Sequence, residues 1–293
     1  PYVYFAFCPL MLPSGDHPNP TVKAQRWPRW LNRLSWVINE WIWCRILIGT
    51  LNRARASRGL KPLRRIWNNL ISARPIVACD PALAPAPSDW PGPPLDQPGA
   101  MFALERAPLS PEVSGFLDRG PPPVYLGFGS MSDRDPRATT ARLLEAVRRT
   151  GVRAVVSRGW AGLDADQAPD GVLFIGPEPH GKLFPRCAAV VHHGGAGTTH
   201  AAARAGVPQV VMPHLLDQFY WAHRVALAGV GPGAVRRHTA DPEPLAHAIR
   251  ACVEDRGLQD RARALGARIA GDGADRAAQL LERVAAGERS ARS

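Results

Sequence analysis

The feature that most constrains this chain is a strand, a glycine-rich turn and a helix that follow one another directly. Residues 188–192 (AAVVH) are typical of a buried strand, and residues 193–197 (HGGAG) lead into a small-residue helix that starts near Thr198. Glycines let oxygen atoms approach the backbone, and a helix N-terminus offers free N–H groups at the positive end of its dipole. Ligands of open parallel sheets collect at the carboxyl ends of the strands. The run therefore predicts an α/β fold with a diphosphate site at this turn.

Other uses of such a turn fit the sequence less well. A dinucleotide-binding fingerprint needs Gly or Ala as its last residue, but the frame from Gly195 has His200 there. An esterase oxyanion loop needs the nucleophile motif G-x-S-x-G, which the sequence lacks. His192, His193 and His200 have neither the acidic partner nor the spacing of a metal site, so we expect no bound metal. A last interpretation, in which the glycines only permit tight helix–strand packing, stays open.

Pattern and composition divide the chain into two regions. Strands are expected at 124–128, 152–157, 172–175, 188–192 and 209–212, and helices at 137–150, 198–205, 217–229 and after Asp241-Pro242. Their alternation indicates an open parallel sheet. Upstream we expect strands at 1–9 and 75–84 and a helix over 27–58. Residues 85–100 hold six prolines and suit a surface linker.

We therefore predict a first domain over 1–105, which ends in a Pro-rich linker at about 81–120, and a second domain over 121–285 with C-terminal helices. The chain begins at Pro1 in a strand-like run without an initiator methionine, so we expect it to be truncated within the first domain. Five scattered cysteines without close pairing indicate a reducing compartment, and we expect a cytoplasmic location.

The sequence from Val190 to Gly231 resembles a known family. The run VVHHGGAGTTHAAARAGVPQVVMPHLLDQFYWAHRVALAGVG is similar to the donor-binding signature of family 1 glycosyltransferases, above all the bacterial antibiotic and macrolide enzymes and the sterol glucosyltransferases. Weaker similarity covers GFGSM (127–131), SRGW (157–160) and PHGKLFP (179–185), and the first residues resemble the middle of the family's acceptor domain. The resemblance implies a GT-B fold of two Rossmann-like domains with parallel sheets, of which the N-terminal one is incomplete.

The resemblance also implies roles for the matching residues. His193 and the backbone of Gly195, Ala196, Gly197 and Thr198 would hold the donor diphosphate, with His193 donating a charge-assisted hydrogen bond. Asp217 and Gln218 would hydrogen-bond sugar hydroxyls, Ser130 would lie beside the nucleotide, and Trp160 and the turn at His180 would lie near its base. Such enzymes need no metal or other cofactor, because the helix N-terminus and the histidine neutralise the leaving diphosphate.

Three of these residues have simpler interpretations. Asp217 could only cap the helix over 217–229, Ser130 could only cap the helix that follows it, and Trp160 could be an exposed loop aromatic.

The chain departs from the family pattern at two places. Plant members carry a ribose-binding glutamate eight positions after the histidine, where this chain has Ala201, so UDP and dTDP donors both stay open. The family's catalytic base, a His or Asp near the front of the first domain, has no counterpart here, and His17 in its Pro/Gly loop is a poor substitute. We expect the base in a missing N-terminal part, and this chain alone to be inactive.

The front of the chain is basic and rich in tryptophan. Residues 1–75 contain twelve Lys and Arg and six tryptophans, with Asp16 and Glu40 as the only acids. Aromatic and cationic residues interleaved on a helix suit a membrane interface, so we predict a lipophilic acceptor and a peripheral membrane contact through 27–65. Alternatively, the tryptophans pack against the rest of the domain. We expect no nucleic-acid partner, because no recognised nucleic-acid module occurs.

The sequence thus predicts an inverting, metal-independent glycosyltransferase. It would move a hexose from a UDP- or dTDP-sugar to a hydroxyl of a lipophilic acceptor such as a natural product, a sterol or a lipid. The alternative is a non-catalytic donor-binding homologue that assists a partner enzyme.

Overall fold

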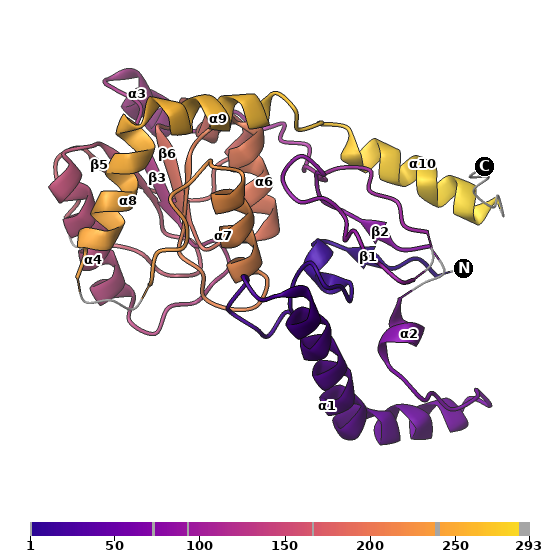
Figure 1. The fold of residues 1–293 in the computed structure, drawn as a ribbon. Coiled ribbons are helices and arrows are strands. Elements are labelled where there is room, and N and C mark those ends of the chain that lie inside the picture. The colour runs from indigo at the N-terminus through magenta and orange to yellow at the C-terminus, as the bar shows by residue number, and fades with distance from the viewer. Residues whose placement is uncertain (1, 72–73, 93, 166, 238–240, 287–293) are drawn as a thin grey trace. The chain divides into compact units, whose positions relative to one another are not determined.

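The computed structural model describes residues 2–71, 74–92, 94–165, 167–237 and 241–286 (Figure 1). Contacts within the chain group them into two units. Unit 1 contains the residues up to Met101 together with helix α10 (Gly273–Ala285), and unit 2 is Phe102–Gly271.

Unit 2 is built on a five-stranded parallel sheet in the order β5-β4-β3-β6-β7. The strands are β3 (Val124–Gly127), β4 (Ala154–Ser157), β5 (Val172–Ile175), β6 (Ala189–His192) and β7 (Gln209–Val211). Leu126 of β3 lies opposite Val156 of β4 and Val191 of β6. The chain runs outward from β3 to β5 and then returns to β6, so the strand order reverses between β3 and β6.

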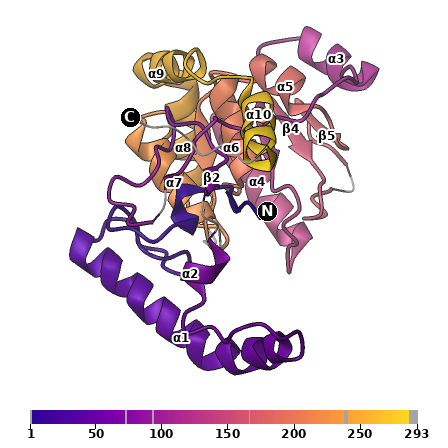
Figure 2. The same ribbon diagram turned by 90° about the vertical axis from the view of Figure 1, so that its right-hand side faces the viewer.

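Helices cover both faces of this sheet, which explains why β3 and β6 are buried along their whole length. The helices are α3 (Pro111–Asp118), α4 (Pro136–Thr150), α5 (His180–Leu183), η2 (Phe184–Arg186), α6 (Ala196–Arg204), α7 (Gln218–Leu227), α8 (Glu243–Glu254) and α9 (Arg256–Gly266). Leu126 and Val191 face the core under α4 and α8. The alternate residues Tyr125 and Val190 face α3, α5 and α6, and Figure 2 shows α3 beside β5.

Side-chain caps fix where several helices start. Asp135 accepts a hydrogen bond from Ala138 N (3.0 Å) at the start of α4, and Pro136 follows at the first helical position. The turn of α4 into β4 uses Gly151 with φ 67°, a left-handed value that suits glycine.

The predicted strands and helices of this unit are confirmed to within a few residues. Pro242 holds the N-cap position of α8, and Asp241 Oδ1 accepts from Glu243 N (2.9 Å).

Unit 1 carries a short parallel strand pair and one long helix. The elements are β1 (Phe5–Ala6), η1 (Pro9–Met11), α1 (Arg29–Ala56), α2 (Trp67–Leu70) and β2 (Ile76–Val77), besides α10. The helix over 27–58 is confirmed. Both strands are shorter than predicted. The first is followed by η1 at Pro9, and the second by a turn in which Asp80 Oδ1 accepts from Ala82 N (2.9 Å).

The described residues of the Pro-rich segment 85–100 form no helix or strand, and several of them are exposed, but side-chain hydrogen bonds hold the segment to unit 1. Its role as a linker stays a prediction. The Asp89 carboxylate accepts hydrogen bonds from Ser14 Oγ and Gly15 N and pairs with Arg33. The Gln97 amide donates to Ala84 O (2.8 Å) and Cys79 O (3.1 Å). Prolines bring no N–H groups that need partners, so a few side chains suffice to pin this segment.

Helix α10 groups with unit 1, whereas the sequence analysis placed it in the second domain. The close approach of Gly273 to the segment before unit 2 accounts for the grouping. A Cβ atom added to Gly273 would lie 2.3 Å from Ala100 O, so only glycine permits this contact.

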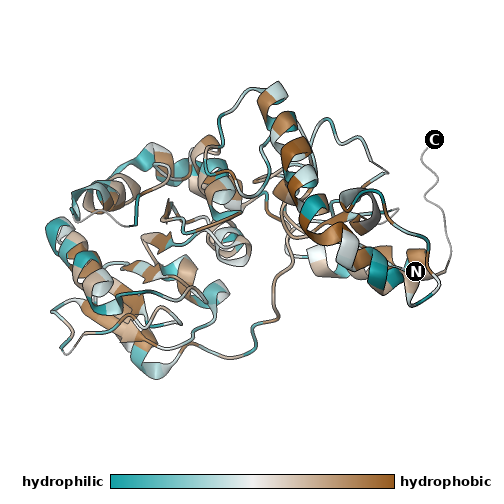
Figure 3. Ribbon diagram, turned by 90° about the horizontal axis from the view of Figure 1, so that it is seen from below, coloured by the Kyte–Doolittle hydropathy of each residue, from teal (hydrophilic) through white to brown (hydrophobic). Residues whose placement is uncertain are grey.

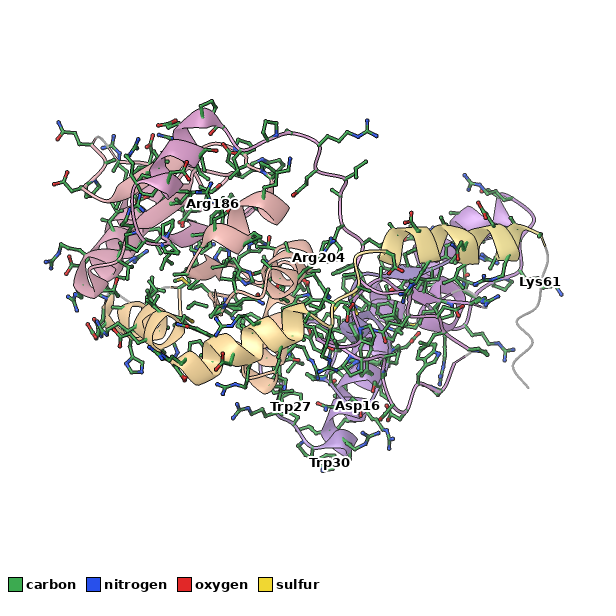
Figure 4. The ribbon with its side chains drawn as sticks, turned by 90° about the horizontal axis from the view of Figure 1, so that it is seen from above. Asp16, Trp27, Trp30, Lys61, Arg186 and Arg204 are labelled. Carbon is green, nitrogen blue, oxygen red and sulfur yellow. The ribbon has the colours of Figure 1, made fainter. Side chains whose placement is uncertain are left out.

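Helix α1 differs from an ordinary amphipathic helix, because its buried side is mostly polar and many of its apolar side chains are exposed. Its buried residues are Asn32, Ser35, Trp36 and Asn39, and Ser35 bonds to Asn19 through both its Oγ and its carbonyl oxygen. Large apolar side chains of this helix are exposed instead: Trp30 is 66% and Trp41 64% accessible. Figure 3 shows hydrophobic residues along this helix, and Figure 4 shows the Trp30 and Lys61 side chains projecting outward. Among the described residues, no helix combines the length and the apolar character that a membrane crossing requires.

Candidate nucleotide-diphosphate site

The glycine-rich turn lies at the carboxyl end of β6, where the strand order of the sheet reverses. Ligands of doubly wound sheets bind at this kind of point, because loops from the two halves diverge there. Gly127 at the end of β3 pairs with His192 at the end of β6, so the loops that follow these strands are neighbours. A Cβ added to Gly129 would lie 3.1 Å from His193 Cε1, which places the histidine ring against the β3 loop.

The backbone of the turn leaves donors for an anion. Gly194 has φ 90°, and an added Cβ would lie 2.8 Å from Val211 Cγ1, so this position requires glycine. Gly195 is the N-cap of α6 without a side-chain cap, and the first helical bond runs from Thr199 N to Gly195 O (2.9 Å). The N–H groups of residues 196–198 precede that bond and have no partner within the helix. A Cβ on Gly197 would meet no atom within 4 Å, so this surface is open to a ligand.

His193 is buried, with 8% of its surface accessible, between the loop at Gly129 and the backbone of Gly195. Burial lowers the pKa of His193 to about 4, because desolvation disfavours the charged imidazolium. The imidazole is therefore neutral at pH 7 before a ligand binds. The charge-assisted hydrogen bond expected from the sequence then requires that the ring gain a proton as the anion binds.

The other two histidines of the run form hydrogen bonds within the protein. His192 is fully buried; its Nδ1 accepts from Gly194 N (3.0 Å), and its Nε2 lies 2.9 Å from Gln209 Oε1. Burial, followed by the neighbouring His193, lowers the pKa of His192 to about 3. His200 Nδ1 bonds to Ala196 O (2.8 Å) inside α6, and its ring packs edge-on against Trp221.

Asp217 precedes α7 and does not cap it with its side chain. Its Oδ2 atom accepts from Trp221 Nε1 (3.1 Å) instead, so the simple cap interpretation is not what the structure shows. Burial raises the pKa of Asp217 and outweighs the hydrogen bonds that lower it. Asp217 is the residue directly before the first turn of α7, and its contact with a sugar stays a prediction.

Gln218 braces the loop that carries Asp217. Its Oε1 accepts from His214 N (2.6 Å) and Leu215 N (3.1 Å), and its Nε2 contacts Met131 Sδ (3.3 Å) in the β3 loop. The same loop contains Leu216 with φ 49°, a left-handed value that costs free energy for a residue with a Cβ. A sugar contact of Gln218 also stays a prediction, and its amide oxygen is already used by the backbone.

Ser130 and Trp160 lie in two loops that contact each other. Ser130 is exposed and does not cap α4, since Asp135 holds that position. Trp160 N donates to Gly129 O (3.0 Å), which joins the loops after β3 and β4, while its side chain is largely exposed. The Trp160 indole is therefore both a loop aromatic and free to meet a ligand.

His180 belongs to the short helix α5. Its ring stacks on Phe184 at a centroid distance of 4.3 Å and meets Tyr125 edge-on at 5.8 Å. Burial lowers the pKa of His180. The partly buried ring thus packs against the core beside β3, and a contact between the turn and a nucleotide base stays a prediction.

One buried ion pair could not be predicted from the sequence. Asp133 in the β3 loop pairs with Arg237, and the two side chains are only 5% and 8% accessible. Arg237 also lies over the Phe128 ring at 5.8 Å. Burial by itself would raise the pKa of Asp133, but hydrogen bonds from Asp135 N and Arg237 hold it below its usual value. The partners are far apart in sequence, so no local pattern could reveal them.

A five-stranded parallel sheet with helices on both faces and a glycine turn at its order reversal defines a doubly wound α/β domain. Residues 141–279 match the family described as Erythromycin biosynthesis protein CIII-like, C-terminal domain. The chain is 40% identical over 288 residues to vancomycin aglycone glucosyltransferase of Amycolatopsis orientalis, covering 96% of this chain and 68% of that protein. It is 34% identical over 256 residues to sterol 3-beta-glucosyltransferase UGT80B1 of Arabidopsis thaliana, covering 85% of this chain and 41% of the relative.

Solved structures show the same fold. The glycosyltransferase VinC in complex with dTDP superposes with a TM-score of 0.60 at 22% identity, covering 80% of this chain and 57% of VinC. Spinosyn rhamnosyltransferase SpnG complexed with thymidine diphosphate gives a TM-score of 0.53 at 26% identity, covering 71% of this chain and 56% of SpnG. The chain thus spans little more than half the length of these structures. It belongs to the GT-B glycosyltransferases that include the vancomycin and sterol glucosyltransferases, which are nucleotide-sugar-dependent enzymes.

Proposed function

We propose that the protein transfers a hexose from a UDP- or dTDP-sugar to a hydroxyl of a lipophilic acceptor, with inversion and without a metal ion. The observation that carries this proposal is the turn at residues 193–198, where His193 and the open N-terminus of α6 meet at the order reversal of the sheet. The relatives named above act on an antibiotic aglycone and a sterol, which supports a lipophilic acceptor. Because those relatives are named transferases, a non-catalytic donor-binding homologue is not favoured.

The transfer reaction requires a site that binds the diphosphate more strongly as it leaves the sugar. The N–H groups of residues 196–198 and the positive end of the α6 dipole would bear on the oxygen atoms that gain charge. His193 would add a donor and, once protonated, a positive charge. Asp217 would hold sugar hydroxyls and so orient the anomeric carbon toward the acceptor.

The general base that takes the acceptor proton is assigned to no described residue. His17 is buried, and its Nδ1 lies 3.2 Å from Pro18 O. Burial lowers the pKa of His17, so it is neutral but enclosed in its loop. Its position supports the expectation that another segment supplies the base.

Calorimetry with UDP and with dTDP tests the donor half of the proposal. We expect at least one nucleotide to bind, and His193→Gln to weaken that binding roughly tenfold, because it loses the imidazole donor. His247→Gln, on the exposed side of α8, is the matched control and should bind as the unchanged protein does. If neither nucleotide binds the unchanged protein, the proposed function is wrong.

We also propose a peripheral membrane contact through residues 27–65. The support is the exposed apolar face of α1, which bears Trp30 and Trp41, together with the basic residues that flank it. Aromatic rings at headgroup depth and arginines near lipid phosphates stabilise such a contact. Sedimentation with vesicles that contain anionic lipid should deplete the protein, and Trp30→Ser with Trp41→Ser should reduce this depletion. Equal depletion by both proteins would exclude this face.

A further inference from the structure

Two polar side chains lie where the sheet of unit 2 is otherwise apolar. His192 at the end of β6 and Gln209 at the start of β7 are both 0% accessible. Their neighbours in the two strands are Val190, Val191 and Val210, which are also fully buried. Burying an imidazole and an amide costs free energy unless each makes hydrogen bonds, so a valine pair would be the simpler solution here.

The hydrogen bonds of this pair lead directly to the glycine turn. Gly194 N donates to His192 Nδ1 (3.0 Å), so this ring nitrogen must carry no proton. A neutral imidazole then holds its proton on Nε2, which donates to Gln209 Oε1 (2.9 Å). A flipped Gln209 amide would set its own N–H group against that proton. The arrangement is therefore consistent only with one tautomer and one amide orientation.

The bond to Gly194 decides which way the backbone of the turn faces. The Gly194 N–H points back toward β6 and is unavailable to a ligand, and the residue is held at φ 90°. Gly194 also lies against Val211 and the backbone of Gln218, so it cannot shift without displacing the loop that carries Asp217. This fixes the direction in which the chain enters α6, and with it the N–H groups of residues 196–198.

We infer that His192 and Gln209 are positioning residues of the diphosphate site: His192 Nδ1 holds Gly194 N–H, and Gln209 holds His192 in the tautomer that can do so. This inference rests on the proposed function, because it assumes that a nucleotide diphosphate binds at the turn. Neither side chain touches the ligand. Their effect is to keep the turn in its binding conformation before the ligand arrives.

Substitutions at His192 separate this role from simple packing. His192→Asn places an amide oxygen near the position of Nδ1 and keeps an acceptor for Gly194 N–H, whereas His192→Leu keeps bulk without an acceptor. We expect the Leu variant to bind UDP or dTDP, whichever the unchanged protein binds, roughly tenfold to a hundredfold more weakly. The Asn variant should recover most of that loss. Val155→Ala, which removes core volume on β4, should lower the melting temperature with no change in affinity.

A second readout reports the positioning without a ligand. In amide hydrogen exchange followed by NMR, the Gly194 amide should be protected in the unchanged protein and in His192→Asn but exchange faster in His192→Leu. Gln209→Met should change the long-range ¹H–¹⁵N pattern of the His192 ring away from a pure Nε2–H tautomer. Binding by His192→Leu as tight as that of the unchanged protein would overturn the inference while leaving the proposed function intact. If the unchanged protein binds neither nucleotide, the proposed function and this inference fall together.

Discussion

At the scale of single residues, the two histidines of the turn are neutral and held in place before any ligand binds. His192 and His193 follow one another in sequence but face different tasks, since one bonds to Gly194 and the other lies against Gly129. The sequence motif indicates the second histidine through its family resemblance. It gives no sign that the first histidine holds the turn, because that role depends on Gln209 in a neighbouring strand.

Nucleotide binding should be coupled to proton uptake at His193. The pKa of the free ring is about 4, and a bound diphosphate favours the protonated form and raises that pKa. Affinity should therefore increase as the pH falls from 8 toward 5. The phosphate groups titrate too, so the comparison is with His193→Gln by calorimetry across this range. An identical pH dependence in both proteins would show that His193 takes up no proton.

His192 and His193 should also make stability depend on pH. Their pKa values of about 3 and about 4 lie below the usual 6.5, so the unfolded chain binds protons that the folded chain rejects. Their contribution is complete above pH 6.5 and is lost as the pH falls toward 4, at up to about 1.4 kcal/mol per pH unit for each histidine. Urea unfolding at pH 7, 6 and 5 measures this slope. His193→Gln should flatten it, and an unchanged slope would contradict the assignment.

Leu216 stores backbone strain in the loop before α7. With φ 49° it occupies a region that glycine adopts freely and other residues adopt at a cost of about 1–2 kcal/mol. Leu216→Gly and Leu216→Ala both remove the half-exposed side chain, but only glycine relieves the strain. We expect the Gly variant to be more stable than the Ala variant by about 1 kcal/mol in denaturant unfolding. Equal stabilities would argue against strain at this position.

At the scale of elements, local patterns predict the strands and helices of unit 2 and, in unit 1, the long helix α1. Short apolar runs such as 188–192 predict the strands of the parallel sheet, because each strand is specified by its own residues. The contacts of the Pro-rich segment could not be predicted, since they depend on Asp89 and Gln97 reaching distant partners. The packing of α1 could not be predicted either, because its polar side is buried and hydrogen-bonds to Asn19.

The β3 loop should depend on the buried pair of Asp133 and Arg237. Arg237→Met leaves the Asp133 carboxylate buried without its cation, and we expect a loss of about 3–5 kcal/mol in the free energy of unfolding. Asp133→Asn combined with Arg237→Met removes both charges and should recover much of that loss. Chemical denaturation of the two variants checks this. A double variant as unstable as the single one would show that packing rather than charge dominates.

At the scale of the whole molecule, the two units have different proposed roles. Unit 2 contains the sheet, the turn and every residue placed in the donor site, whereas unit 1 offers the exposed apolar face of α1. The resemblance that covers Val190–Gly231 predicted the donor site because those residues are contiguous in sequence. The Asp133–Arg237 pair lies outside that run, and the His192–Gln209 pair lies within it, but neither contact could be predicted because each joins segments that only the fold brings together.

The central claim is that a nucleotide diphosphate binds at the N-terminus of α6. An NMR titration of the ¹⁵N-labelled protein with UDP and with dTDP tests it directly, because the amide signals of residues 196–198 report on hydrogen bonds to the anion. We predict that these three amides shift most, together with the His193 ring signals, while amides of unit 1 such as those of α1 stay unchanged. Saturable shifts elsewhere with no change at residues 196–198 would contradict it.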